Sequence, residues 1–284
     1  MSEQALTVRF WGTRGSVSAP GPAARQFGGD TACVEVSNGP HAIIFDAGSG
    51  LRRLGLTFRE RGLETADIFF SHCHYDHIIG LPFFSPLFDS TIQVTLWSGH
   101  LHGHMTTRQM VEEFMRAPFF PVRPAVFSPN TRYRDFVPGD TLRPPGAAVI
   151  HTGALNHADG AVGYRLESDG RVVAYITDHE HGNATADATV ERLIHGADLL
   201  VIDATYTDAE YPSHRGWGHS TWQEGVRVAD AAGVGTLAIF HHDPSHNDAF
   251  MDDVAREAAV ARPGNAPGGL PRAIVAHEGL TLTP

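Results

Sequence analysis

The stretch that decides the fold of this chain is His72-Cys73-His74-Tyr75-Asp76-His77. It places three imidazoles and one carboxylate within six residues. The preceding residues 66–71 have the pattern of a buried strand, and Ile78-Ile79-Gly80-Leu81 reads as the start of a helix. Imidazole and carboxylate together suit zinc, manganese or iron. The stretch therefore predicts a metal cluster on a tight strand-to-helix turn, and it is nearly sufficient for two ions.

The composition is that of a folded, acidic protein. Hydrophobic residues make up 42% and charged residues 19% of the 284 residues, which excludes an intrinsically disordered chain. Thirty-two acidic residues against 21 basic ones give a formal net charge of −11. Because such a surface repels phosphate backbones, extended nucleic acid is not expected as a partner. A local basic patch or a bound metal would still attract a small anionic substrate.

The cysteines and the N-terminus favour a cytoplasmic location. Cys33 and Cys73 are the only cysteines, so there is no disulfide framework, and a reducing compartment fits. Residues 1–5 lack the basic region and apolar run of a secretory signal. No segment reaches the roughly 18 apolar residues of a membrane helix, so no membrane contact is expected.

Strand-like and helix-like segments alternate along the chain, and residues 1–284 are predicted to form one domain. Predicted strands are Val8–Phe10, Cys33–Val36, Ala42–Asp46, Ile68–Ser71, Ile92–Trp97, Ala148–His151, Val162–Glu167, Val172–Thr177, Leu199–Asp203, Thr236–Phe240 and Ala273–Ala276. Predicted helices are one capped by Ser49 and running to about Arg61, then Met105–Arg116, Thr185–His195, Ser220–Ala232 and Asp248–Arg262. This order suggests two packed sheets with helices outside.

Three further segments are interpreted individually. The loop Gly12–Gly29 is rich in Gly, Pro and Ser and is long enough to line a site. The aromatic-rich excursion Phe114–Phe127 is expected to be a flap over the site, an oligomer contact that would allow a homodimer, or a strap packed on the core. His100, His102 and His104 are spaced by two and form either a third metal site or a polar loop.

Four more ligand-type residues stand at the ends of predicted strands. They are Asp46, His157, Asp178 and His241, and each lies at or just beyond the end of such a segment. With the opening stretch they supply five histidines and two carboxylates, with Asp46 as an additional carboxylate behind them. That number and type of ligands suits two metal ions.

The order and spacing of these ligands resemble the metallo-β-lactamase superfamily over essentially the whole chain. Within the superfamily the chain is most similar to the ribonuclease Z-like branch, which includes cyclic-nucleotide phosphodiesterases. This likeness is carried by Gly218-His219-Ser220-Thr221, Asp203-Ala204-Thr205-Tyr206, Gly12-Thr13-Arg14-Gly15-Ser16 and His241-His242-Asp243-Pro244. The resemblance implies an αββα sandwich: two packed mixed β-sheets with helices on the outer faces.

The resemblance also implies a role for each ligand. His72, His74 and His157 would hold one divalent metal, and Asp76, His77 and His241 would hold the other. Asp178 would bridge both metals, and Asp46 would orient a ligand from behind. Zinc is the default metal, with manganese and iron open. The implied reaction is attack on phosphorus by a metal-bridging hydroxide, with Asp76, His219 and Asp203 as the catalytic residues.

His219 has a physical argument of its own. Ser220 and Gln223 form a capping-box pattern, so His219 is expected just before a helix N-terminus, where a phosphate is favoured. Protonated His219 would contact an oxygen or protonate the leaving alkoxide, and Asp203 would hold its ring. Ribonuclease Z typically has glutamate at the position of Asp203. Weaker substrate contacts are expected from Arg14, Ser220, Thr221 and His242.

The leading function is therefore a hydrolase of small phosphodiesters such as cyclic nucleotides. Ribonuclease Z grips tRNA with an arm inserted between the third and fourth metal motifs, but here only 20 residues separate His157 from Asp178. The alternatives are a ribonuclease Z-like RNA-processing nuclease and a lactonase or thioesterase of the same superfamily. The complete ligand set argues against a catalytically silent binding protein.

Overall fold

Strand-forming runs build two mixed seven-stranded sheets in the computed structural model, which describes residues 5–37, 39–146 and 148–284. The first sheet has the order β14 (Thr281–Leu282), β1 (Thr7–Gly12), β2 (Cys33–Ser37), β3 (His41–Phe45), β4 (Thr65–Phe69), β5 (Gln93–Ser98) and β6 (Thr131–Asp135). The second has the order β13 (Ala273–Val275), β12 (Thr236–Phe240), β11 (Leu199–Asp203), β10 (Arg171–Ile176), β9 (Ala161–Ser168), β8 (Val149–Leu155) and β7 (Thr141–Leu142).

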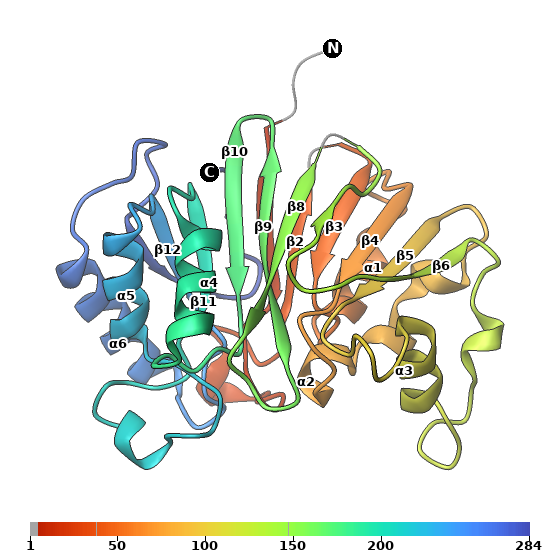
Figure 1. The fold of residues 1–284 in the computed structure, drawn as a ribbon, viewed down its shortest axis with the longest axis horizontal. Helices are drawn as coiled ribbons and strands as arrows, with labels where there is room; N and C mark the ends of the chain where they lie inside the picture. The colour runs from red at the N-terminus through yellow and green to blue at the C-terminus, as the bar shows by residue number, and fades with distance from the viewer. Residues whose placement is uncertain (1–4, 38, 147) are drawn as a thin grey trace.

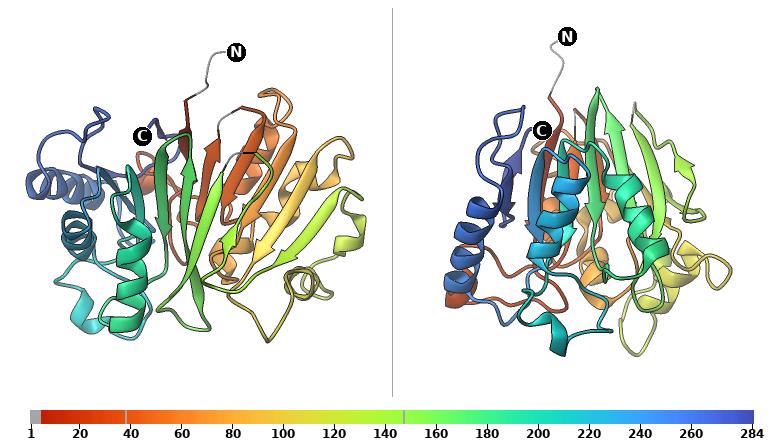
Figure 2. Two further views of the ribbon diagram at one scale, coloured as in Figure 1. Left: turned by 45° about the horizontal axis from the view of Figure 1, so that its top comes forward. Right: turned by 60° about the vertical axis from the view of Figure 1, so that its left-hand side comes forward.

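Helices cover the outer faces of the two sheets (Figures 1 and 2). The α-helices are α1 (Leu51–Thr57), α2 (Tyr75–Ile78), α3 (Thr107–Phe114), α4 (Ala184–Ile194), α5 (Trp222–Ala231) and α6 (Asp248–Ala261). Short 3₁₀ helices are η1 (Pro22–Ala24), η2 (Leu81–Phe83), η3 (Ser85–Phe88), η4 (Pro124–Val126) and η5 (Tyr211–Ser213). Helices α4, α5 and α6 lie on one side of the sheets, and α1 and α3 lie on the other (Figure 1).

Three hydrophobic clusters hold these layers together. Phe45, Tyr175 and Phe240 belong to the cluster between the sheets, where the Phe45 and Tyr175 rings stack with centroids 5.1 Å apart. The other two clusters bury the apolar stripes of the helices against the outer sheet faces. Two packed mixed sheets with helices on their outer faces form an αββα sandwich, which is the predicted architecture.

Parallel pairing brings the functional strand ends together. Strands β3, β4 and β5 run parallel in one sheet, and β10, β11 and β12 run parallel in the other. Their carboxyl ends meet at one edge of the sandwich, where open α/β sheets place their ligands. Asp46, Asp178 and His241 follow β3, β10 and β12 at this edge.

Three local predictions were wrong. Ser49 does not cap α1, because its hydroxyl donates to Asp30 Oδ1 at 2.8 Å and Gly50 occupies the cap position. The helix that was expected to begin at Ile78 is instead the single turn α2, which ends there. The capping-box prediction at Ser220 is off by one residue, because Thr221 caps α5 and accepts the Glu224 N–H at 3.0 Å.

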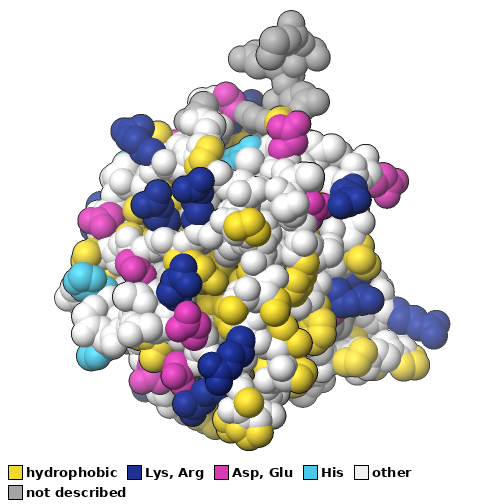
Figure 3. Space-filling view, turned by 90° about the vertical axis from the view of Figure 1, so that its right-hand side faces the viewer, with side chains coloured by type: hydrophobic (Ala, Val, Ile, Leu, Met, Phe, Trp, Pro, Cys, Tyr) yellow, Lys and Arg dark blue, Asp and Glu magenta, His cyan; other side chains and the backbone are white. Residues whose placement is uncertain are grey.

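The Phe114–Phe127 excursion packs partly on the core. Phe127 is buried and Phe120 packs against the cluster under α1 and α3, which agrees with the core-strap interpretation. Phe119 points outward and is 78% exposed. Figure 3 shows hydrophobic side chains gathered among Lys and Arg side chains on the face that lies to the right in Figure 1. A homodimer contact through this face stays a prediction.

None of the described helices combines the length and the apolar composition that a membrane crossing requires.

Candidate metal centre

The stretch His72–His77 forms a tight turn at the end of β4. His72 lies in the turn, His74 is the N-cap residue of α2, and Asp76 and His77 lie on α2 itself. Asp76 and His77 are buried, so the turn presents their side chains to the interior of the sheet edge. The short spacing therefore brings the side chains together, as predicted.

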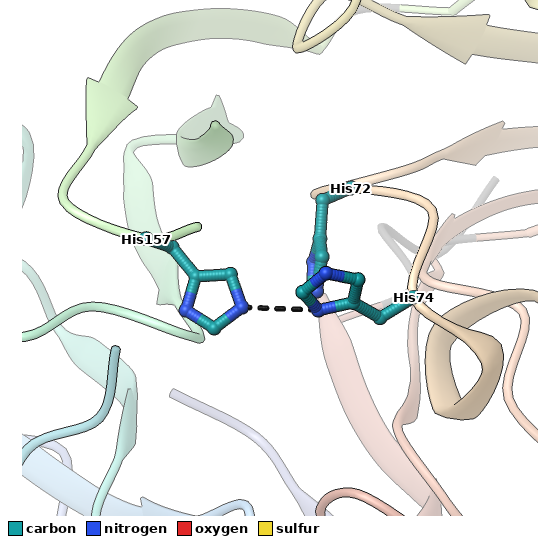
Figure 4. Close-up of side chains that lie close together, drawn as sticks. All are labelled: His72, His74 and His157. Carbon is teal, nitrogen blue, oxygen red and sulfur yellow. Dashed lines mark hydrogen bonds between the residues drawn. The ribbon is translucent and has the colours of Figure 1, made fainter. Parts of the chain in front are cut away.

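Three histidines converge at one side of the centre (Figure 4). His74 Nδ1 lies 3.1 Å from His157 Nε2, and the His72 and His157 ring centroids are 4.8 Å apart. His157 Nδ1 donates to the Gly218 carbonyl oxygen at 2.8 Å, so in the neutral ring Nε2 carries the lone pair. The buried His72 Nε2 has no hydrogen-bond partner among the described residues. Converging imidazole nitrogens of this kind suit a cation.

A second group lies beside the first. His77 Nε2 and His241 Nε2 are 3.3 Å apart, and Asp76 Oδ2 lies 3.1 Å from the former and 3.3 Å from the latter. His77 Nδ1 donates to Asp46, which leaves the His77 Nε2 lone pair facing inward when the ring is neutral. Two imidazole nitrogens that face each other with a carboxylate between them also suit a cation.

Asp178 stands between the two groups. Its Oδ1 lies 3.2 Å from His77 Nε2 and 3.2 Å from His241 Nε2. Its Oδ2 lies 3.7 Å from His72 Nε2 and 3.6 Å from His157 Nε2. Each carboxylate oxygen therefore faces a different set of histidines, which is the arrangement that a bridging ligand requires.

Burial and neighbouring charges both shift the pKa values of side chains in this cluster, and for Asp178 the two effects oppose each other. Burial lowers the pKa of His72 well below its usual value, which keeps the ring neutral as a metal ligand must be. Burial alone would raise the pKa of Asp178, but the nearby histidines, His241 foremost, hold it well below its usual range. The cluster of histidines and aspartates is consistent with a dinuclear metal site.

Asp46 supports the cluster from behind. Its Oδ2 accepts hydrogen bonds of 2.8 Å each from Ser71 Oγ, His77 Nδ1 and Tyr175 OH, and its Oδ1 accepts the Ser71 N–H at 2.7 Å. The bond to His77 fixes the tautomer and orientation of that ring. The roles of Ser71 and Tyr175 cannot be predicted from the sequence, because they depend on tertiary contacts with Asp46.

Replacing Asp46 by alanine should weaken metal binding by about 10–100-fold, the usual effect of losing such an outer partner. The reason is that His77 Nδ1 would lose its acceptor and the ring its fixed orientation. Titration against a competing chelator measures the change. Asp67→Ala is the matched control, because Asp67 is an equally buried carboxylate that bonds Trp97 and His41 instead. Wild-type metal affinity in Asp46→Ala would contradict this role.

The backbone around the centre is strained. Asp46, Asp178 and His241 have φ values of 61°, 50° and 62°, a region that residues other than glycine seldom adopt. Such strain gathers at functional sites. The glycine-rich loop Gly12–Gly29 also packs closely against this centre. A Cβ on Gly15 would lie 2.4 Å from the His241 ring. The Ser16 N–H donates to Asp76 Oδ2 at 2.7 Å.

His219 and Asp203 form a buried pair next to the cluster. His219 Nδ1 donates to Asp203 Oδ2 at 2.8 Å, so the shorter aspartate does reach the ring. Burial lowers the pKa of His219, but Asp203 and the other carboxylates raise it to a net value of about 9. Thr205 Oγ donates to Asp203 Oδ1 at 2.6 Å and lies 3.0 Å from His241 Nδ1. The pair is thus coupled to the His241 side of the cluster.

An open cleft of about 440 Å³ leads to the centre. It is lined by Ser16, Cys73, His74, Tyr75, Asp76, Asp178 and His219. This volume falls within the range of small-molecule sites.

The four weaker substrate contacts do not fit the structure. Arg14 is fully buried, and its guanidinium donates to the carbonyl oxygens of Gly28 at 2.8 Å and His246 at 2.6 Å. His242 is fully buried and bonds the Ala276 carbonyl oxygen. The buried hydroxyl of Ser220 donates to the His179 carbonyl oxygen at 2.6 Å, and the hydroxyl of Thr221 donates to Asp208 Oδ1 at 2.6 Å. All four side chains serve the scaffold.

The three loop histidines do not assemble a third cluster. His102 and His104 are exposed, and His100 is largely covered near the cleft. Among the described residues, the groups that could hold a metal include none of the three. The polar-loop interpretation agrees with this placement.

Comparisons with known proteins place the chain in a family. The beta-lactamase superfamily domain model matches residues 41–242. Ribonuclease Z of Haloarcula marismortui is 24% identical over 308 residues, covering 91% of this chain and 93% of the relative. Ribonuclease Z of Haloferax volcanii is 28% identical over 282 residues, covering 83% and 84%.

Solved structures share the fold. YhfI from Bacillus subtilis, a metallo-beta-lactamase fold protein, has a TM-score of 0.71 at 18% identity over 99% of both chains. A diphosphatase from the PhnP family has a TM-score of 0.63 at 20% identity over 98% of this chain and 96% of the other. Zinc-bound PqqB from Methylobacterium extorquens has a TM-score of 0.65 at 17% identity over 97% and 99%.

The chain belongs to the metallo-β-lactamase superfamily and, within it, to the ribonuclease Z-like branch. Together with the buried His/Asp cluster, this makes it a metal-dependent hydrolase of that superfamily.

Proposed function

We propose that this protein hydrolyses small phosphodiesters, with cyclic nucleotides as the leading example, at a dinuclear metal centre. The observation that carries the proposal is the Asp203–His219 pair beside the cluster, since it sets a buried cation at the cleft. A phosphodiester brings a negative charge to that cation, whereas a lactone or thioester does not. The partner proposed for the cleft is therefore a small anionic molecule.

The candidate ligands fall into two groups, one for each proposed metal ion. His72, His74 and His157 would hold one metal, and Asp76, His77 and His241 would hold the other, with Asp178 between them. When bound, two divalent ions would activate a water and offset charge on the phosphoryl oxygens. Zinc suits the imidazole-rich ligand set, and it is present in the PqqB neighbour.

His219 would act on the substrate directly. Because its Nδ1 donates to Asp203, the other nitrogen remains to face the substrate. With a pKa of about 9 the ring is a cation at neutral pH. It would hold a phosphoryl oxygen or deliver a proton to the leaving alkoxide. Asp203 keeps the ring oriented and charged.

The substrate is proposed to be small because residues 157–178 form only a hairpin. Strands β9 and β10 are joined by a tight turn at Asp169-Gly170, and no arm extends between His157 and Asp178. The net charge of −11 adds a general repulsion of long polyanions.

Processing of RNA in the manner of ribonuclease Z is the second candidate. It is favoured by relatives of that name, which align with 83–91% of this chain. The same centre would serve either substrate, so only the size of the accepted diester separates the two candidates.

A substrate panel on metal-quantified protein tests the proposal. Bis(p-nitrophenyl) phosphate and cyclic nucleotides should be hydrolysed, with activity lost on chelation and restored by metal. A pre-tRNA, a lactone and a thioester complete the panel. The proposal fails if the metal-loaded protein leaves every phosphodiester intact while cleaving the lactone or thioester. Faster cleavage of the pre-tRNA than of any small diester would favour the second candidate.

A further inference from the structure

We propose that Tyr75 provides the surface on which an aromatic part of the substrate, such as a nucleobase, stacks while its phosphate lies at the metal centre. This inference rests on the proposed phosphodiester hydrolysis and narrows its substrate class to nucleotides.

Tyr75 is an exposed aromatic ring at a catalytic cleft. It lines the cleft together with Asp178 and His219, yet its side chain is 75% exposed. Among the described residues, no hydrogen bond engages its hydroxyl and no other ring contacts its faces. A ring that lacks protein neighbours at the entrance of a polar cleft is free to cover a flat ligand.

The backbone holds Tyr75 in place from both sides. His74 precedes it as the N-cap residue of α2, with its ring 3.1 Å from His157. Asp76 follows it and accepts the Ser16 N–H at 2.7 Å. Tyrosine has only two side-chain torsions, so ordering its ring against a ligand costs little conformational entropy. The backbone of Tyr75 is therefore held before a ligand arrives, and only the two side-chain torsions remain to be ordered.

The residues that line the cleft are of two kinds, polar side chains and one aromatic ring. Ser16, His74, Asp76, Asp178 and His219 are polar and belong to the metal centre or its contacts, and Cys73 is small. Tyr75 carries the single phenyl ring in this lining. The polar floor suits phosphate, and the ring suits an aromatic group attached to it. One base–aromatic stack changes affinity by roughly five- to 150-fold.

A pair of ligands that differ only in the base isolates this contact. Adenosine 5′-monophosphate and ribose 5-phosphate share the sugar and the phosphate, and only the first carries adenine. Calorimetric titration of the zinc-loaded protein with each gives the ratio of their dissociation constants. We expect the nucleotide to bind more tightly, and Tyr75→Ala to reduce that preference about tenfold. Tyr75→Phe should preserve it, because stacking needs the ring and not the hydroxyl.

Two controls separate stacking from other effects. Phe119→Ala removes an aromatic ring of similar exposure that lies outside the cleft lining, and it should leave the preference unchanged. Metal content of each variant must equal that of the wild type, since Tyr75 adjoins two proposed ligands.

The outcomes for this inference and for the proposed function are distinguishable. Equal affinity of the wild type for the two ligands, or an unchanged preference in Tyr75→Ala, overturns the role of Tyr75. A preference that falls as far in Phe119→Ala as in Tyr75→Ala also overturns it. Turnover of bis(p-nitrophenyl) phosphate by the same preparation tests the hydrolase function separately, whatever the titrations show.

Discussion

Replacing Asp178 by alanine should abolish hydrolysis while the fold survives. We expect kcat to fall by more than about 100-fold, because loss of even an outer partner of a metal ligand typically costs about 10–100-fold in metal affinity or activity. The reason is that one carboxylate faces both histidine sets, with Oδ1 3.2 Å from His241 Nε2 and Oδ2 3.7 Å from His72 Nε2. Its removal would affect both proposed metal positions at once.

Metal analysis identifies the cause of that loss. Asp178→Ala should bind fewer than two equivalents, because each ion loses a negatively charged oxygen in a buried site. Asp178→Asn keeps the size of the side chain and removes its charge. It therefore shows whether metal binding depends on the charge of residue 178 or only on its shape. His102→Ala, a change at an exposed histidine, controls for the loss of a polar side chain. Two tightly bound metals and near wild-type turnover in Asp178→Ala would contradict the bridging role.

The convergence of the candidate metal ligands could be predicted largely because it follows local rules. His72, His74, Asp76 and His77 lie within one short turn, and no distant contact is needed to bring them together. Asp178 and His241 follow the rule that functional groups gather beyond the carboxyl ends of parallel strands, whereas His157 lies beyond β8, whose neighbours in the sheet run antiparallel to it. Asp178 lies two residues beyond the last residue of β10, Ile176, and has a φ of 50°.

The supporting contacts could not be predicted, because they join segments far apart in the chain. Arg14 sits in a glycine-rich loop that favours exposure, but the backbone carbonyl oxygens of Asp243 and His246 capture its guanidinium. Tyr175 reads as an ordinary strand residue, and its bond to Asp46 exists only because the two sheets face each other. Such contacts depend on the packed sandwich and not on sequence spacing.

The predictions of two helix caps were wrong for a related reason, because the side chains bond groups that lie elsewhere in the chain. Ser49 and Ser220 have the residue type of an N-cap, but their hydroxyls find other partners in Asp30 and the His179 carbonyl oxygen. Strand β6 was missed because Thr131-Arg132-Tyr133-Arg134-Asp135 lacks the apolar content of a buried strand. It is an edge strand of its sheet, where charged residues are tolerated.

Replacing His219 by alanine should slow hydrolysis and spare the metals. We expect kcat to fall by about 10²–10⁴-fold, the range that a single general acid contributes. Both metals should remain, because neither proposed ligand group, His72/His74/His157 or Asp76/His77/His241, includes His219. Parallel measurement of metal content and kcat separates the two properties, and His102→Ala again serves as the control.

The opposite outcome has a structural basis. Asp178, Asp203, His219 and His241 also lie close enough to hold an ion. If His219→Ala loses metal in proportion to activity, His219 is a ligand and its assignment as an acid is wrong.

Asp203→Asn distinguishes an acid from a packing residue, because it keeps the imidazole and removes the charge that holds it protonated. Asp203 raises the pKa of His219 toward about 9, against the lowering effect of burial. Without the Asp203 charge the pKa of His219 falls, so the His219 ring loses its proton at a lower pH. The basic limb of the pH–rate profile should therefore move to lower pH in Asp203→Asn, whereas a purely structural His219 would leave the profile in place and change only stability.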